Sequence, residues 1–275
     1  MKIRRRTLPP GWYPEGEAAT EQAIRRYLAE IPEGGNTAGA GVAPHAGWEF
    51  SGGVALEVFL NLKKDIDTMI VVGGHLSSSG GVIAAFEEGY ETPLGPISAD
   101  LELLEKIENK ITVSEDIYPD NTVEVQLPFV RYFFPRARAL ALRAAPSDDA
   151  IKLGEALAAA AGELERKIAV VGSTDLTHYG RNYGFSPAGE GEAALRWVTE
   201  VNDKGFIDCL LKMEARKALE HARENHSACS AGGAVAALSF ARASGSMKGE
   251  LLRYLTSYDI FPSESFVGYA GIIFL

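Results

Sequence analysis

The stretch Thr68-Met69-Ile70-Val71-Val72-Gly73-Gly74-His75 decides the fold of this chain. Its apolar residues follow one another without polar alternation, which is typical of a strand that is buried on both faces. The segment Ile168-Ala169-Val170-Val171 shows the same pattern. Strands of this kind belong to parallel sheets covered by helices, so the sequence predicts a three-layer α/β/α protein with a central mixed, mainly parallel sheet.

The rest of the chain supplies the other expected elements. Hydrophobic periodicity and turn signals predict further strands near residues 38–43, 82–86, 138–143, 251–257 and 266–274, and helices over about 17–30, 53–62, 101–108, 150–166 and 231–243. Residues 1–16 are expected to form an extended arm, and residues 190–225 two or three helices broken near Asn202 and Gly205. No repeat or clear linker divides the chain, so one domain over residues 1–275 is predicted.

Composition excludes several classes of protein. A hydrophobic content of 46% and a charged content of 23% are ordinary for a soluble globular protein. The net charge of −10 argues against a general nucleic-acid binder. No window approaches the ~18 apolar residues of a membrane span, and no apolar stretch follows the basic start as in a secretory signal. Two cysteines are too few for a disulfide framework. We expect a cytoplasmic protein with no nucleic-acid or membrane partner; the oligomeric state is not determined.

Three of the five histidines follow apolar runs that end in glycine, proline or a short polar segment. They are His45, His75 and His178. Ligands bind at the carboxyl ends of strands in open α/β sheets, and imidazole is both a common metal ligand and a common proton shuttle. The pattern therefore predicts one polar, metal-bearing site at one edge of the sheet.

Cys229 is a further candidate ligand, because it lies at the expected start of the 231–243 helix. The positive end of a helix dipole favours the thiolate, which is the form that binds metals. Two imidazoles and a thiolate suit zinc, copper or iron. Structural alternatives remain: His45 could be a buried histidine satisfied by the backbone, His75 part of an anion-binding nest, and Cys229 a small core residue.

The segment Ser173-x-Asp175-x-x-His178 has two interpretations. It could supply a hydrolase nucleophile and its base, although Gly-x-Ser-x-Gly is absent. An acid/base histidine held by local hydrogen bonds fits better. The remaining cysteine and histidines are expected to be structural or solvent-exposed: Cys209 in the core, His221 on the surface, and His226 at most beside the site.

Four segments carry a resemblance to a known family. Ala43-Pro44-His45-Ala46-Gly47-Trp48-Glu49-Phe50-Ser51-Gly52, Glu124-Val125-Gln126-Leu127-Pro128-Phe129, Ser173-Thr174-Asp175-Leu176-Thr177-His178-Tyr179 and Thr256-Ser257-Tyr258-Asp259 resemble the Memo family. That family is similar in fold to the catalytic subunits of class III extradiol dioxygenases (LigB-like). The resemblance runs from about Leu8 to Leu275.

The resemblance implies roles for several residues. His45, His75 and Cys229 fall on the family's metal-binding positions, and His178 falls where the dioxygenases keep their acid/base histidine, with Asp175 beside it. The dioxygenases bind Fe(II) through two histidines and a carboxylate. Here Cys229 takes the place of the carboxylate. The cofactor expected is a divalent metal, with iron first and copper or zinc as alternatives.

Three residues are candidates for substrate binding. Trp48 could shape an aromatic pocket or simply pack, and Glu124 could bind the substrate or pair internally with Arg131 or another base. Asn121 stands where many relatives carry a histidine.

The expected function is that of a metal-dependent, dioxygenase-like oxidoreductase acting on, or binding, a small aromatic or polar molecule. One alternative is a module that binds phosphorylated peptides in the same pocket, although no arginine pair lies near the histidines. Another is a zinc-dependent hydrolase with a water activated by the same three ligands.

Overall fold

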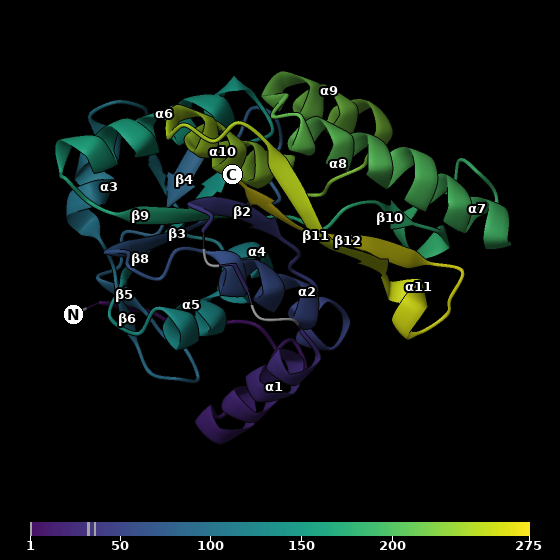
Figure 1. The fold of residues 1–275 in the computed structure, drawn as a ribbon, viewed down its shortest axis with the longest axis horizontal. Coiled ribbons are helices and arrows are strands. Elements are labelled where there is room, and N and C mark those ends of the chain that lie inside the picture. Colours follow the sequence, from purple (N-terminus) through teal and green to yellow (C-terminus); the bar gives the residue numbers. More distant parts are fainter. Residues whose placement is uncertain (1, 32–33, 36) are drawn as a thin grey trace.

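The computed structural model describes residues 2–31, 34–35 and 37–275. Its centre is a mixed sheet with the strand order β10-β12-β2-β9-β3-β8-β4-β7, and β11 pairs with β12 (Figure 1). Four neighbouring strands are mutually parallel: β2 (Ala40–Ala43), β9 (Ile168–Ser173), β3 (Thr68–Gly73) and β8 (Arg138–Ala144). Antiparallel pairing occurs on both sides of these four strands. On one side, β4 (Val82–Ala84) is antiparallel to β8 and parallel to β7 (Ser114–Glu115). On the other side, β12 (Phe266–Phe274) is antiparallel to β2, β10 (His178–Tyr179) and β11 (Gly249–Thr256).

Helices cover both faces of this sheet (Figure 1). One face carries α3 (Leu101–Glu108), α6 (Asp148–Glu163), α8 (Asp203–Leu211), α9 (Ala215–Asn225) and α10 (Ala231–Ala243). The other carries α1 (Glu17–Glu30), α2 (Trp48–Asn61), α4 (Asn121–Glu124) and α5 (Leu127–Phe133). The remaining elements are the helices η1 (Arg181–Tyr183), α7 (Gly191–Trp197), η2 (Val198–Asn202) and α11 (Ser257–Ile260), and a small sheet of β1 (Ile3–Arg4), β5 (Gly89–Tyr90) and β6 (Ile97–Ser98).

The apolar run of β3 shows why the sheet has helices on both sides. Successive side chains of a strand point to opposite faces. Ile70 and Val72 belong to one core cluster and Met69 and Val71 to the other, and all four are fully buried. The predicted three-layer α/β/α architecture with a mixed sheet is confirmed. Most of the parallel pairing lies among the four central strands of the sheet.

Two helix boundaries differ from those expected. Helix α2 begins at Trp48 instead of near residue 53, because the Trp48 ring stacks on Phe129 of α5, a helix that the sequence analysis does not anticipate. The expected break near Asn202 and Gly205 is wrong. The π-helix η2 continues directly into α8, and the interruption comes after Leu211.

Gly205 has a packing role in place of the expected helix break. A Cβ at this position would overlap the imidazole of His221 on α9. His221 is partly buried and its Nδ1 lies 2.8 Å from Ser227 Oγ, so it lies at the surface as expected but its ring is packed and not freely solvated.

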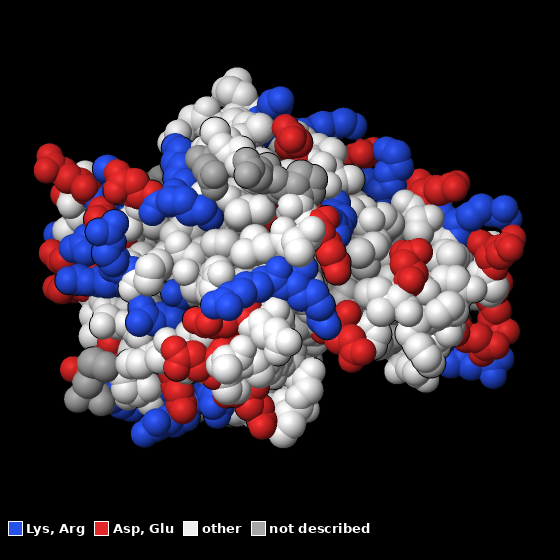
Figure 2. Space-filling model, turned by 60° about the horizontal axis from the view of Figure 1, so that its bottom comes forward, with Lys and Arg blue, Asp and Glu red and all other residues white. Residues whose placement is uncertain are grey.

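On the face drawn in Figure 2, Lys and Arg side chains are interspersed with Asp and Glu. Within the described ranges, no helix has both the length and the apolar character needed to cross a membrane.

Candidate metal centre

The carboxyl ends of three parallel strands bring the predicted residues together. His45 follows β2, His75 follows β3, and Asp175 follows β9, which lies between the other two strands. Cys229 reaches the same point from the loop before α10, where its N–H donates to the Asp175 carbonyl oxygen at 3.2 Å. The sheet order therefore explains why residues so far apart in the sequence meet at one place.

Three of these side chains form a compact donor set. The ligand atoms of His45, His75 and Cys229 all lie within 4.8 Å of one another. His45 Nε2 is 3.2 Å from Cys229 Sγ, and the two imidazole rings are nearly perpendicular with centroids 5.1 Å apart. Two imidazole nitrogens and one sulfur suit zinc, copper or iron, so the residues present fit a transition-metal ion.

His45 is the most firmly held of the three. Its side chain is buried, and its Nδ1 lies 3.3 Å from Ser173 Oγ. Ser173 in turn accepts a hydrogen bond from Gln126 Nε2 at 3.1 Å. Burial, together with the nearby His75, lowers the pKa of His45 to about 3. The imidazole is therefore neutral at pH 7, which is the form that binds a metal.

His75 is positioned by a tight contact between two loops. Gly74 has a φ of +119°, a conformation that suits glycine, and its N–H donates to Thr122 Oγ1 at 2.9 Å. A Cβ on Gly73 would overlap the Thr122 side chain. The glycine pair thus lets the segment around Thr122 lie directly on the end of β3, and it brings Asp120 within 3.6 Å of His75 Nδ1.

Asp175 forms the floor between the two histidine strands. Its Oδ1 accepts hydrogen bonds from the backbone N–H groups of His45, at 2.6 Å, and Ala46, at 3.2 Å. Burial raises the pKa of this carboxyl group to about 6, although the donors and the nearby histidines act in the opposite direction. A second donor set overlaps the first, since Asp175, His178 and Cys229 also lie within 4.8 Å of one another.

The protonation state of the Cys229 thiol differs from the one expected from the sequence. Its place just before α10 is as predicted, but burial and the Asp175 carboxylate raise its pKa above the usual range. The helix dipole therefore does not produce a thiolate in the metal-free protein. A coordinated divalent cation would reverse this, because it removes the proton from a ligating thiol.

His178 is oriented for proton transfer. Its Nδ1 lies 3.2 Å from the Leu176 carbonyl oxygen, which can only accept, so Nδ1 carries the proton of the neutral ring and Nε2 is its basic nitrogen. Burial lowers the pKa of His178, against the effect of Asp175. The ring also makes an edge contact with Tyr183, at a centroid distance of 5.0 Å.

A cavity of about 450 Å³ opens beside these groups. Its lining includes His45, His75, Asp175 and His178, together with Asn121 and five aromatic rings: Trp12, Phe50, Tyr183, Phe261 and Tyr269. Among the residues that the structure describes, no lysine or arginine belongs to this lining. The cavity is thus aromatic and polar, without the fixed positive charge that a phosphate site requires.

The three predicted substrate-binding residues differ in position. Asn121 lines the cavity and donates through Nδ2 to the His45 carbonyl oxygen at 3.3 Å. Trp48 lies in the core and not in the lining: its ring stacks on Phe129 at 4.0 Å and its Nε1 donates to a backbone carbonyl. Glu124 also lies off the cavity and pairs internally.

The internal partners of Glu124 come from the N-terminal segment. Its carboxylate accepts hydrogen bonds from the backbone N–H groups of Thr7 and Leu8, the Thr7 hydroxyl and the Tyr13 hydroxyl. Arg131, the partner considered from the sequence, donates instead to the Leu94 and Pro135 carbonyl oxygens. Glu124 thus anchors the segment before α1 to α4.

Several residues around the site escape the sequence analysis. Asp120 approaches His75 and pairs with Arg143, and Gln126 supports His45 through Ser173. Gln126 lies inside a segment that carries the family resemblance, which is the one signal that points to it. Of the residues judged structural, Cys209 packs against the core as expected, and His226 lies outside the described cavity lining, where it contacts Phe185.

Comparison with known proteins now gives the family. A family model described as "Memo-like protein" matches residues 4–273. The chain belongs to the Memo family. A MEMO1 family protein of Pyrococcus abyssi is 33% identical over 279 residues, which cover 95% of this chain and 96% of that protein. One of Thermococcus kodakarensis is 33% identical over 290 residues, which cover 99% of each.

One solved structure gives a partial match to this Memo family chain. It is that of the uncharacterized protein JW3007 from Escherichia coli K12, which has a TM-score of 0.47 and 13% sequence identity. The match covers 79% of this chain and 90% of that one. The resemblance inferred from the four sequence segments is confirmed by the family model and the two archaeal relatives.

Proposed function

We propose that this Memo family protein binds one divalent transition-metal ion through His45, His75 and Cys229, and that it acts as a dioxygenase-like metalloprotein. The observation that carries the proposal is the convergence of two imidazoles and one thiol within 4.8 Å, each delivered by a different segment of the chain. Iron is the ion that the resemblance to extradiol dioxygenases implies. The donor set also suits copper and zinc.

The chain's own residues supply binding and proton transfer. A bound ion would contribute Lewis acidity and, if it is iron or copper, electron transfer. His178 Nε2 is the basic nitrogen beside the cavity and would accept or return a proton of the bound molecule. Asp175 holds the loop of His45 through two backbone N–H groups and thereby fixes the distance between that ligand and His178.

The aromatic walls of the cavity favour a small aromatic substrate. Tyr183 lies against His178, and Phe50 and Phe261 are exposed to solvent, so a planar ring could stack near the proton-transfer group. Asn121 would donate a hydrogen bond to a polar substituent or accept one from it. The volume of about 450 Å³ falls in the range of small-molecule sites.

The alternative functions differ in the support that the site gives them. A phosphorylated peptide would need cationic side chains, and the described lining of the cavity holds none. A serine hydrolase would need an accessible nucleophile, whereas Ser173 is fully buried and bonded to Gln126. Hydrolysis by a zinc-bound water would use the same donor set and is therefore an outcome of the experiment.

The test is the metal content of protein purified anaerobically without a histidine tag. Cys229→Ser and His75→Ala should each lower metal affinity by at least about 10–100-fold, which is the effect of disturbing even the outer groups of a metal site. Cys209→Ser and His226→Ala are the matched controls, because they remove the same side-chain types outside the cavity. Metal content that is unchanged in His75→Ala would refute the proposal.

The identity of the metal directs the next assay. Iron or copper near one equivalent would be followed by oxygen uptake with catechol-like compounds. Zinc with oxygen-independent ester or amide hydrolysis would establish the hydrolase instead. No metal in either the wild type or the variants, with binding of a phosphorylated peptide, would establish the binding module.

A further inference from the structure

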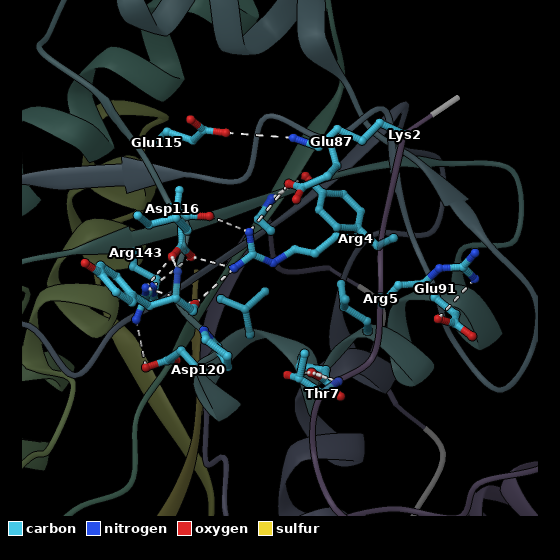
Figure 3. Close-up of a pocket in the computed structure, with 18 residues that line it drawn as sticks. Lys2, Arg4, Arg5, Thr7, Glu87, Glu91, Glu115, Asp116, Asp120 and Arg143 are labelled. Atoms are coloured by element: carbon cyan, nitrogen blue, oxygen red, sulfur yellow. Dashed lines mark hydrogen bonds and ion pairs between the residues drawn. The ribbon is translucent and has the colours of Figure 1, made fainter.

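We propose that Asp120, held in place by Arg143, is a positioning residue that orients the imidazole of His75 toward the other two ligands. This inference rests on the proposed metal site, since orientation matters only if His75 is a ligand. It concerns residues that do not themselves contact the ion. Its basis is a chain of alternating charges from Arg4 through Asp116 and Arg143 to Asp120 (Figure 3). The last of them, Asp120, lies 3.6 Å from His75 Nδ1.

His75 needs such support more than His45 does. The His75 side chain is 42% exposed, whereas that of His45 is 1% exposed. The segment that follows His75 is Leu76-Ser77-Ser78-Ser79, whose serines are exposed. A partly exposed ring on such a loop loses rotational freedom when it binds a metal, and a partner that fixes it in advance removes part of that cost.

Asp120 is the group that can fix the ring. Its Oδ2 lies 3.6 Å from His75 Nδ1, which is an ion-pair distance that a small rotation would convert into a hydrogen bond. Its Oδ1 accepts from the Thr122 N–H at 2.8 Å and from the Thr122 hydroxyl. Since Thr122 also receives the Gly74 N–H, Asp120 and His75 are tied to the same loop contact.

Arg143 fixes Asp120 from the other side. Its Nη1 lies 3.1 Å from Asp120 Oδ2, and its Nε and Nη2 bind the two carboxylate oxygens of Asp116. Figure 3 shows the Arg143 guanidinium between these two carboxylates. Arg4 also binds Asp116, with Nη2 at 3.2 Å from Oδ2. The charges therefore alternate in sign from the partly exposed Arg4 to Asp120, so each has a partner of opposite sign.

This arrangement determines which nitrogen of His75 is free. A carboxylate near Nδ1 favours the tautomer with the proton on Nδ1, because an ionised carboxylate can only accept. The lone pair is then on Nε2. A carboxylate–histidine–metal arrangement of this kind is the usual way in which outer groups orient a ligating imidazole. The Nδ1 of His45 faces a serine hydroxyl instead, so of these two histidines His75 is the one whose Nδ1 faces a carboxylate.

The test compares Asp120→Asn with Asp100→Asn. Asp120→Asn removes the charge and leaves Arg143 paired with Asp116. Asp100 is an equally suitable buried carboxylate for the control, since it pairs with Arg138 and Arg166 and lies near the start of β3, far along the strand from His75. Asp120→Glu is the rescue variant, because it keeps the carboxylate.

Two readouts are measured on each protein. The first is the Zn²⁺ affinity, by competition with a chromophoric chelator. The second is the long-range ¹H–¹⁵N NMR spectrum of the His75 ring in the metal-free protein. We expect Asp120→Asn to weaken Zn²⁺ binding by about 10–100-fold and to shift His75 away from the Nδ1–H tautomer. Asp100→Asn should change neither, and Asp120→Glu should restore the tautomer.

The outcomes separate this inference from the proposed function. Zn²⁺ affinity or a His75 spectrum unchanged in Asp120→Asn overturns the inference while the metal site stands. The same losses in Asp100→Asn also overturn it, since they would reflect general destabilisation. Wild-type protein that does not bind Zn²⁺, iron or copper overturns the proposed metal site, and the His75 spectrum then decides alone whether Asp120 orients the ring.

Discussion

Replacing the buried carboxylate of Asp203 by an amide should stabilise this protein at neutral pH. Asp203 is fully buried and accepts hydrogen bonds from the Thr177 N–H, at 3.0 Å, and the Tyr254 hydroxyl, at 2.8 Å. No described basic side chain forms an ion pair with it. Burial raises its pKa from 3.8 to about 7, although these hydrogen bonds lower it. The ionised form is therefore held at a cost in the folded protein.

The sign and size of the effect follow from proton linkage. The folded protein holds the Asp203 proton more tightly than the unfolded chain, so the stabilisation from this group is complete below about pH 4. It is lost as the pH rises through about 7. A pKa difference of this size corresponds to roughly 4 kcal/mol in total, of which about 2–3 kcal/mol falls between pH 5 and pH 8. Asp203→Asn lacks this pH-dependent contribution to stability, because an amide does not ionise.

The assay is urea unfolding of wild type and Asp203→Asn at several pH values from 5 to 8. The variant should be about 1 kcal/mol less stable at pH 5, because one amide hydrogen lacks an acceptor, and should become the more stable protein by pH 8. Asp100→Asn is the control, because it removes a buried carboxylate that pairs with Arg138 and Arg166 and should therefore destabilise the protein. A difference in unfolding free energy between Asp203→Asn and wild type that does not vary with pH would refute the reasoning.

Two further predictions concern residues first considered for substrate binding. Trp48→Phe keeps an aromatic ring against Phe129 but loses the Nε1 hydrogen bond to the Val125 carbonyl oxygen. It should therefore lower the free energy of unfolding by about 1–3 kcal/mol and leave metal affinity unchanged. Weaker metal binding by a variant of unchanged stability would contradict the assignment of Trp48 to the core. Glu124→Gln should loosen the segment around Thr7, Leu8 and Tyr13, because the amide offers one acceptor oxygen where the carboxylate offers two, and hydrogen exchange in residues 2–13 should rise at least several-fold. Exchange that is unchanged there would show that the strand pairing of β1 alone holds the segment.

The layers of the fold could be predicted because burial on both faces leaves a direct mark in the sequence. The run through Ile70 and Val71 is apolar at every position, since helices cover both sides of β3. The helix boundaries were harder to predict from the sequence. Trp48 starts α2 because of a stacking partner, Phe129, that lies far along the chain, and Gly205 stays helical because it accommodates His221. Neither contact has a local signal.

The positions of two candidate ligands, His45 and His75, and of the candidate orienting residue Asp175 could be predicted for a similar reason. His45, His75 and Asp175 each follow a strand whose end the sequence marks with glycine, proline or serine. The groups that hold them come from elsewhere: Gln126 from the turn before α5, Arg143 from β8, and Asp120 from a loop. Nothing local in the sequence marks these three residues as neighbours of the histidines. Only the tertiary contacts show that Gln126 reaches His45 through Ser173 and that Arg143 reaches His75 through Asp120.

The two glycines before His75 mark a strand end in the sequence and also make a tertiary contact possible. Gly73 is the last residue of the buried strand β3, and the sequence marks it as the end of an apolar run. Its lack of a Cβ matters because a side chain at this position would overlap Thr122. Thr122 can then receive the Gly74 N–H and hydrogen-bond Asp120. The carboxylate that approaches His75 is thus placed by the glycine that precedes His75 by two residues. A side chain at position 73 would displace Asp120 and Thr122 together, and His75 would lose its partner without itself being changed.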